Sequence, residues 1–401
     1  MKTTADQMRA WRGPAVLTFG FRPFFLGGAI WAGLAMTLWV AMLAGVLDLP
    51  TAFDPTSWHA HEFLYGYLGA AAAGFLLTAV PNWTGQLPVV GWRLGGLAAL
   101  WLLGRIVVTF GGGLPALIVA LIDLSFYLAL IAVLAREIIR GKNWRNLVVV
   151  LMLGVMTLGN ALFHWDGAGA GYGAGGAGLR LGLGAGIMMI GVIGGRIVPS
   201  FTRNWLVRRG DGVLPVPPMQ RFDKAALLML AMALLAWVIV PKALPTGLGL
   251  LVAGVLHLIR LSRWAGHRTG AEPLVWVLHV GYLFVPLGAL AVGVAVLWPG
   301  TSGTAAAQHL WMAGGVGLMT LAVMTRATLG HTGQPLTAGR GTVGIYLLLI
   351  AAVVLRVVAG GLPDIAGGLH TLAGLSWIAA FSTFVVIYGP LLMRPRRGRA
   401  V

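Results

Sequence analysis

Twelve long apolar stretches follow one another along this 401-residue chain, and they constrain its fold more than any other feature. Each has 20 or more residues, and about 20 apolar residues are enough for a helix to cross a bilayer. Only 10% of the residues are charged, against about 25% in soluble domains, which excludes a soluble enzyme. We therefore expect an all-α, polytopic membrane protein with twelve transmembrane helices in a lipid bilayer. The stretches lie near residues 21–47, 58–80, 91–110, 114–139, 144–165, 178–197, 222–241, 244–263, 272–297, 304–325, 338–360 and 367–392.

The basic residues are confined to alternate connections between these stretches. Of the 28 lysines and arginines, 24 lie on the side of the membrane that carries the N-terminus. Short loops rich in lysine and arginine stay in the cytoplasm, so we expect both the N- and C-termini to be cytoplasmic. The same pattern accounts for the net charge of +17, and no nucleic-acid partner is expected. The predicted location is the bacterial inner membrane, crossed many times.

A single integral membrane domain is expected over residues 1–401. It comprises helices 1–6 over about 21–197, a cytoplasmic loop over about 198–221, and helices 7–12 over about 222–392. A four-helix internal repeat is also suggested, because His61 and His309 each precede a Thr-Gly-Gln tripeptide by 23 residues. A period of four preserves helix direction and would make spans 2, 6 and 10 equivalent. The alternative is coincidence in a chain rich in glycine and alanine.

Histidine is the residue type that says most about chemistry in this chain. Eight of the nine histidines lie within or at the ends of apolar stretches, where ionisable groups are costly and usually functional. Because the chain has no cysteine, imidazole is the expected ligand for haem or copper. The candidate cofactor ligands are His59, His61, His257, His279, His309 and His331.

Sequence position divides these histidines between the two ends of the membrane. The metal-site candidates are His59, His61 and His309, at the outer ends of their spans, whereas His257 and His279 are expected nearer the cytoplasm. An ordinary structural hydrogen bond is the alternative role for each of them. For His164 and His370, near the aqueous surface, that alternative has at least equal weight.

Charged residues are expected to support the histidine sites. The candidates are Glu62, Arg105, Arg196 and Arg326. Glu62 follows His61 directly and could orient its ring or relay protons. Arg105 could pair with haem propionates, or it could extend to the lipid headgroups. Asp123, inside the fourth span, is a candidate for a proton path or for pairing with an arginine.

Several runs of residues resemble the NnrS family over nearly the whole chain. They are Trp58-His59-Ala60-His61-Glu62, the run 74–85 (GFLLTAVPNWTG), Gly195-Arg196-Ile197-Val198-Pro199 with Phe201-Thr202, Leu278-His279-Val280-Gly281-Tyr282, and Met324-Thr325-Arg326 with Leu329-Gly330-His331-Thr332-Gly333. Gln334 departs from the family pattern, in which arginine is expected. The resemblance implies a polytopic membrane protein that contains haem b and copper and is linked to nitric oxide metabolism, denitrification and resistance to nitrosative stress.

On this resemblance we expect the protein to bind or redox-convert nitric oxide at haem or at a haem–copper pair. Whether it turns over as an oxidoreductase stays open, and the sequence identifies no electron donor. One alternative is a proton-coupled secondary transporter that uses its buried charges and its repeats. Another is a non-catalytic haem or copper sensor, or a metal-handling protein.

Overall fold

Helices are the only regular elements among residues 10–299 and 303–395, the part of the chain that the computed structural model describes. Twelve helical segments in this part are long and apolar enough to span a membrane, which confirms the predicted fold class. In the order below, α marks α-helices and η marks 3-10 or π-helices. The elements are η1 (Ala15–Leu17), α2 (Phe21–Leu43), α3 (Pro55–His61), η2 (Glu62–Tyr67), α4 (Leu68–Thr84), α5 (Trp92–Phe110), α6 (Ala116–Arg140), η3 (Trp144–Asn146), α7 (Leu147–Ala170), η4 (Gly173–Gly175), α8 (Ala177–Met189), η5 (Ile190–Gly194), α9 (Gly195–Arg208), α10 (Arg221–Ile239), α11 (Leu244–Ser262), η6 (Gly266–Arg268), α12 (Pro273–Leu297), α13 (Thr304–His309), η7 (Leu310–Leu318), α14 (Met319–Thr332), α15 (Arg340–Ala359), η8 (Pro363–Ile365) and α16 (Ala366–Met393).

Several spans continue as helix beyond the apolar stretches that predicted them, and the sixth and tenth do so by the most residues at one end. Helix α9 extends to Arg208, so the loop expected from residue 198 begins only after it. Helix α14 extends to Thr332 and includes His331, beyond the apolar stretch expected to end near residue 325. Hydropathy detects the part of a helix that lies in lipid, and a polar helical extension into water carries no such signal.

Each of spans 2, 6 and 10 contains a π-helix, namely η2, η5 and η7. A π-turn interrupts the regular hydrogen-bond ladder, and buried side chains bond to the carbonyls there. In η2, Tyr127 donates to the carbonyl of Tyr65 at 2.6 Å and Trp101 donates to that of Gly66 at 2.9 Å. In η5, Arg260 donates to the carbonyl of Gly191 at 2.9 Å. The internal repeat stays a prediction, and the π-helices are a further feature that the three spans share.

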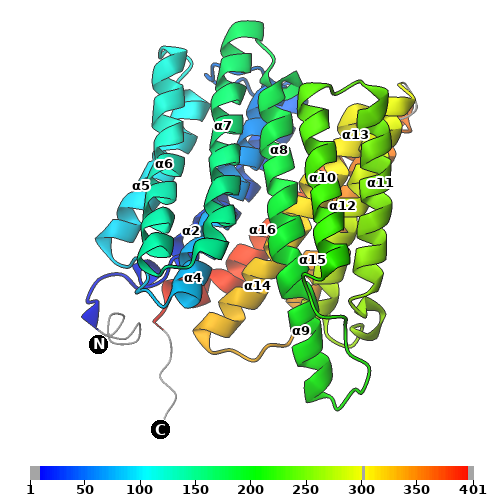
Figure 1. Cartoon of the computed structure of the whole chain (residues 1–401). Helices are drawn as coiled ribbons and strands as arrows, with labels where there is room; N and C mark the ends of the chain where they lie inside the picture. Colours follow the sequence, from blue (N-terminus) through cyan, green and yellow to red (C-terminus); the bar gives the residue numbers. More distant parts are fainter. Residues whose placement is uncertain (1–9, 300–302, 396–401) are drawn as a thin grey trace. The chain divides into compact units, whose positions relative to one another are not determined.

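The described chain divides into two compact units. Unit 1 comprises residues up to 182, 327–335 and from 381 on, and unit 2 comprises 183–326 and 336–380. In unit 1, α5 packs beside α6 and α6 beside α7 (Figure 1). Arg22 in α2 also holds the end of α16, because its guanidinium donates to the carbonyls of Leu392 at 2.9 Å and Arg394 at 2.6 Å.

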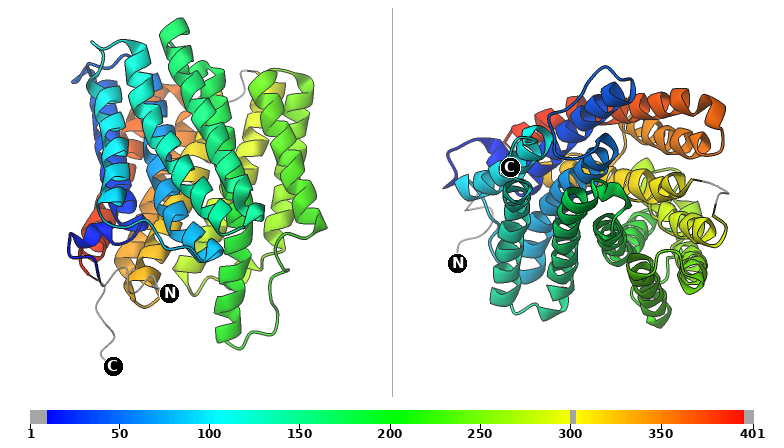
Figure 2. Two further views of the ribbon diagram at one scale, coloured as in Figure 1. Left: turned by 60° about the vertical axis from the view of Figure 1, so that its left-hand side comes forward. Right: turned by 90° about the horizontal axis from the view of Figure 1, so that it is seen from above.

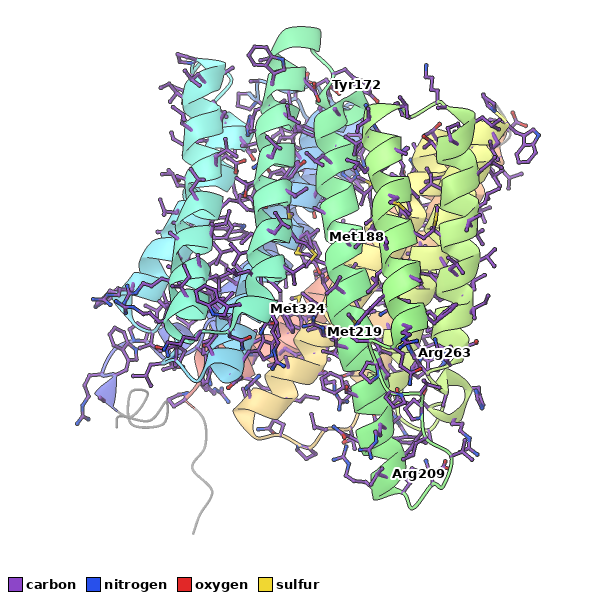
Figure 3. The ribbon with its side chains drawn as sticks, viewed as in Figure 1. Tyr172, Met188, Arg209, Met219, Arg263 and Met324 are labelled. Atoms are coloured by element: carbon purple, nitrogen blue, oxygen red, sulfur yellow. The ribbon has the colours of Figure 1, made fainter. Side chains whose placement is uncertain are left out.

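Unit 2 contains the neighbouring helices α10, α11 and α12 (Figure 2). Figure 3 shows Arg209 and Arg263 at the same, lower end of this unit, beyond the ends of α9 and α11. Both arginines belong to connections that the charge pattern assigns to the cytoplasm. The sidedness of the chain stays a prediction, and residues 1–9 and 396–401, which carry part of the expected cytoplasmic charge, lie outside the described residues.

Candidate metal centre

The second span begins with helix α3, and Asp54 caps the N-terminus of this helix. Asp54 Oδ1 accepts hydrogen bonds from the backbone N–H groups of Thr56 and Ser57, both at 3.0 Å. Helix α3 then ends at His61, and π-helix η2 begins at Glu62. Neighbouring residues of a regular α-helix point about 100° apart. Here His61 and Glu62 are both fully buried, and His61 Nδ1 lies 3.1 Å from Glu62 Oε1.

Six buried polar side chains from four membrane spans of unit 1 meet at this point, and we name them the His61 cluster. Its members are His61, Glu62, Arg105, Asp123, Asn160 and His164. Asp123 Oδ2 lies 3.2 Å from Nε2 of His61 and 3.2 Å from Nε2 of His164. The same oxygen accepts a hydrogen bond from Asn160 Nδ2 at 2.7 Å. Arg105 joins the two carboxylates, because it donates to Glu62 Oε1 at 2.6 Å and to Asp123 Oδ1.

The charges of the cluster do not cancel. Glu62 and Asp123 contribute two negative charges and Arg105 one positive charge, and none of the three side chains is more than 1% exposed. A net negative charge inside a membrane-spanning bundle is strongly unfavourable. Neutrality therefore calls for one more positive charge, which a proton on an imidazole or a carboxylate or a metal ion held between the side chains would supply.

The ligand atoms of this cluster have the spacing of a metal site. Among the described residues, His61, Asp123 and His164 are the one group of three potential ligands whose donor atoms all lie within 4.8 Å of one another. A tetrahedral ion with bonds of about 2.0–2.1 Å holds its ligand atoms about 3.3 Å apart. The two observed distances from Nε2 to Asp123 Oδ2 are both 3.2 Å. Two imidazoles and a carboxylate are donors that suit copper, iron and zinc, so the residues fit a single transition-metal ion.

Neighbouring groups fix the orientation of the His61 ring. Glu62 receives hydrogen bonds from Arg105 at Oε1 and from Trp31 Nε1 at Oε2, the latter at 2.6 Å. It thereby holds the Nδ1–H of His61 and leaves Nε2 facing two oxygen atoms, Asn160 Oδ1 at 2.9 Å and Asp123 Oδ2 at 3.2 Å. Arg105 reaches this position because residue 66 is glycine: a Cβ there would lie 2.7 Å from its Nη1.

An aromatic ring from the loop before α3 covers the two imidazoles. The Phe53 ring centroid lies 5.4 Å from that of His61 and 5.3 Å from that of His164. Gly167 leaves space for this ring, because a Cβ at that position would lie 2.5 Å from Phe53 Cε1. A cavity of about 20 Å³ lies beside Phe53 and His164, which is room for about one water molecule.

The other predicted outer ligands lie in different surroundings. His59 stacks on Trp39, with ring centroids 4.4 Å apart and planes 15° apart, on a different side of the helix from His61. His309 belongs to unit 2, where its Nδ1–H donates to the carbonyl of Ala305 at 2.6 Å. The set of His59, His61 and His309 stays a prediction, and the contacts in unit 1 favour a different set around His61.

His257, one of the predicted inner ligands, uses both ring nitrogens within unit 2. Its Nε2–H donates to the carbonyl of Ala226 at 3.2 Å, so Nδ1 accepts the hydroxyl hydrogen of Tyr282 at 2.9 Å. The Tyr282 oxygen in turn accepts from Arg260 at 2.7 Å, and Arg260 pairs with Asp223 at 3.0 Å. All five residues are joined in one satisfied hydrogen-bond chain.

His279, the other predicted inner ligand, has different partners. Thr202 Oγ1 donates to the carbonyl of Val198 at 2.9 Å and therefore accepts from His279 Nε2–H at 2.7 Å. Nδ1 of His279 is buried without a hydrogen-bond partner among the described residues. It faces Gly266, where a Cβ would lie 2.5 Å from it.

The remaining predicted residues lie outside the His61 cluster. His331 stacks on Phe21 in unit 1, with ring centroids 5.3 Å apart. In unit 2, the Arg326 guanidinium lies 4.3 Å from the centre of the Phe201 ring, and the carbonyl of Arg196 accepts a hydrogen bond from Ser200.

Three members of the cluster, Asp123, His164 and Asn160, are not among the site residues that the sequence predicts. Asp123 was expected to form a proton path or pair with an arginine, and it pairs with Arg105. His164 is expected near the aqueous surface, and Asn160 is not among the candidate residues. A signal existed, because residues 160 and 164 are four apart and lie on one face of a helix.

Comparison with known proteins identifies the family to which nearly the whole chain is similar. Residues 15–396 match the family model described as NnrS protein, and this range includes every member of the His61 cluster. None of the curated proteins compared with the chain matches it significantly.

Proposed function

The chain belongs to the NnrS family, and from this membership and the His61 cluster we propose that it is a membrane metalloprotein that binds or redox-converts nitric oxide. Family membership supports a nitric-oxide-related, multi-pass membrane protein. The finer parts of the proposal are a copper ion at the His61 cluster, a role in denitrification and in resistance to nitrosative stress, and a place in the bacterial inner membrane. The main observation in support of the proposal is the spacing of the ligand atoms of His61, Asp123 and His164.

The residues of the cluster have separate tasks in this proposal. His61, Asp123 and His164 would hold the ion, and a bound copper ion would supply a coordination site for nitric oxide and a one-electron redox couple. Glu62 keeps the His61 ring in the required tautomer and orientation. Arg105 balances one of the two negative charges, so Cu(I) with two neutral imidazoles would make the cluster neutral, and Cu(II) would leave it with one positive charge.

Haem b, the second cofactor that the family implies, fits neither the cavity beside His164 nor the surroundings of His279. The cavity of about 20 Å³ beside His164 is far smaller than a porphyrin ring. At His279, the unpartnered Nδ1 is the right kind of ligand atom, but Gly266 lies directly against it. We therefore base no step on haem, and a pyridine-haemochrome assay on purified protein tests for it directly.

Metal analysis of the purified full-length protein tests the proposal. After expression with added copper, iron or zinc, we expect one transition-metal ion per chain. We expect the double variant His61→Gln with His164→Gln to lose it. If the ion is Cu(II), its electron paramagnetic resonance spectrum should show coupling to imidazole nitrogen and should change when nitric oxide is added.

The matched control is His267→Gln, an exposed histidine outside the cluster. This variant should keep the metal content and spectrum of the wild type. Full metal content in the double variant would overturn the site. If the wild-type protein binds the metal but its spectrum does not change when nitric oxide is added, the proposed function is wrong.

A further inference from the structure

The cavity beside His164 runs from exposed residues to buried ones. Its lining includes Ala116, which is exposed, and Val108 and Val119, which are 1% and 4% exposed. His164, 7% exposed, also lines the cavity and contacts Asp123 in the His61 cluster. The cavity therefore leads from the end of the bundle where α6 begins to one of the proposed metal ligands.

The lining of this cavity is apolar except at His164. Ala52, Phe53, Val108, Ala116, Val119 and Ala168 contribute carbon surfaces. An ion that entered would lose its hydration without a charged partner in the lining, and an anion would also approach the carboxylates of Asp123 and Glu62. An uncharged molecule meets neither penalty.

The volume of the cavity limits the size of that molecule. About 20 Å³ holds roughly one water-sized molecule, and the walls are side chains packed by the fold. Phe53 stays in place because Gly167 leaves room for its ring. Val119 comes from α6 and Val108 from α5, so two helices fix the inner end of the cavity.

We infer that this cavity is the entry and binding position for a small uncharged ligand of the size of a diatomic gas, and that Val108, Val119 and Phe53 set its size limit. The inference rests on the proposed function only for the metal to which such a ligand binds. The cavity itself is a property of the fold and is testable without metal.

Single engineered thiols test the cavity in metal-free protein, since the natural chain has no cysteine. Ala116→Cys at the mouth should react with both methyl methanethiosulfonate and a bulky maleimide. Val119→Cys should react with the small reagent and at least tenfold more slowly with the bulky one. Val149→Cys, a fully buried valine of α7 outside the cavity, should react with neither reagent.

Carbon monoxide and isocyanides of increasing length test the size limit in protein loaded with Cu(I). Wild-type protein should bind carbon monoxide and discriminate at least tenfold against n-butyl isocyanide relative to methyl isocyanide. Val119→Ala should reduce this discrimination, and Val119→Ile should slow carbon monoxide association about tenfold with unchanged metal content. Val149→Ala and Val149→Ile are the matched controls and should behave as wild type.

The two experiments separate this inference from the proposed function. Absence of metal with the expected thiol pattern would overturn the proposed site and leave the cavity supported. Reaction of Val119→Cys with neither reagent, or equal rates with both, would overturn the inference. So would carbon monoxide association that is the same in Val119→Ile as in wild type.

Discussion

Glu62 accepts hydrogen bonds from Trp31, His61 and Arg105, and it can do so only as a carboxylate, which has acceptors alone. Glu62→Gln turns one oxygen into an amide that faces a donor. We expect the affinity for metal to fall about 10–100-fold, because the support of the His61 ring is lost. A titration against a competing chelator measures this change.

Asp364→Asn is the control for this substitution, since Asp364 is exposed and lies outside the cluster. It should keep the affinity of the wild type. An unchanged affinity in Glu62→Gln would mean that the contact with His61 has no part in metal binding.

Arg105 is the cation shared by Glu62 and Asp123. Arg105→Met leaves both carboxylates buried without it, and breaking a buried pair in this way costs about 3–5 kcal/mol. We expect that loss in metal-free protein and a smaller loss with metal bound, because a divalent ion supplies positive charge. Thermal unfolding in detergent, with and without metal, measures both.

Arg180→Met is the control, because the half-buried Arg180 donates to the carbonyl of Gly175 and forms no ion pair in the described structure. Its loss of stability should be smaller and independent of metal. Equal losses with and without metal in Arg105→Met would place the ion away from the two carboxylates.

The sequence predicted half of the His61 cluster as site residues: His61, Glu62 and Arg105. These were recognisable because an adjacent histidine and glutamate and an arginine within a span are costly in a membrane. His164 could not be assigned in the same way, because a histidine near a span end is equally compatible with water. The meeting of Asp123 with two histidines depends on how α3, α6 and α7 pack, which hydropathy does not encode.

Helix η2 brings His61 and Glu62 to the same cluster, and it does so by one wide turn. Deletion of Phe63, the one member of η2 that is not fully buried, should restore a regular α-helix. His61 and Glu62 would then point about 100° apart, as neighbouring residues of a regular α-helix do, and Glu62 would no longer hold the His61 ring. We expect loss of the metal with helix content retained, measured by metal analysis and circular dichroism.

A deletion in η7 is the matched control. Met312 is half-buried in that π-helix, and η7 belongs to unit 2, whereas the His61 cluster belongs to unit 1. Deletion of Met312 should leave the metal content unchanged. If deletion of Phe63 also left it unchanged, the register of η2 would have no role in the site.

Glycines in span 2 allow a neighbouring helix to approach closely. A Cβ at Gly69 would lie 2.3 Å from the Tyr127 hydroxyl, which donates to the carbonyl of Tyr65 in η2. We expect Gly69→Ala to destabilise the protein by about 1–3 kcal/mol, because the ring must move. Gly96→Ala in α5 adds a methyl group with nothing within 4 Å and should cause no loss. Thermal unfolding of the two variants distinguishes them, and equal stability would mean that Tyr127 is free to shift.

Hydropathy predicted all twelve spans because each contains enough apolar residues to be counted independently of its neighbours. It predicted neither the π-helices nor the polar end of α9. The π-helices lie within the apolar stretches of their spans, and the end of α9 lies beyond its apolar stretch. Both features depend on backbone hydrogen bonding, which changes the direction of side chains without changing composition.

The direction in which the His164 cavity opens depends on the sidedness of the whole molecule. The charge pattern predicts that the end of the bundle where α3 and α6 begin faces away from the cytoplasm. Each unit supplies two exposed loop positions, one expected at each end: Asp48 and Lys142 in unit 1, and Lys242 and Gly212 in unit 2. Because the chain has no cysteine, a single thiol at each position reports one side of the membrane.

We expect Asp48→Cys and Lys242→Cys to react with a membrane-impermeant maleimide in cells whose inner membrane is intact. Lys142→Cys and Gly212→Cys should react only after that membrane is permeabilised. Lys242 gives the most stringent test of the four positions, because it is a basic residue in a loop that the charge pattern assigns to the outer side. The reverse labelling pattern would mean that the protein has the opposite orientation in the membrane and that the cavity beside His164 opens towards the cytoplasm. Nitric oxide is uncharged and crosses lipid, so it could reach the metal site from either side of the membrane.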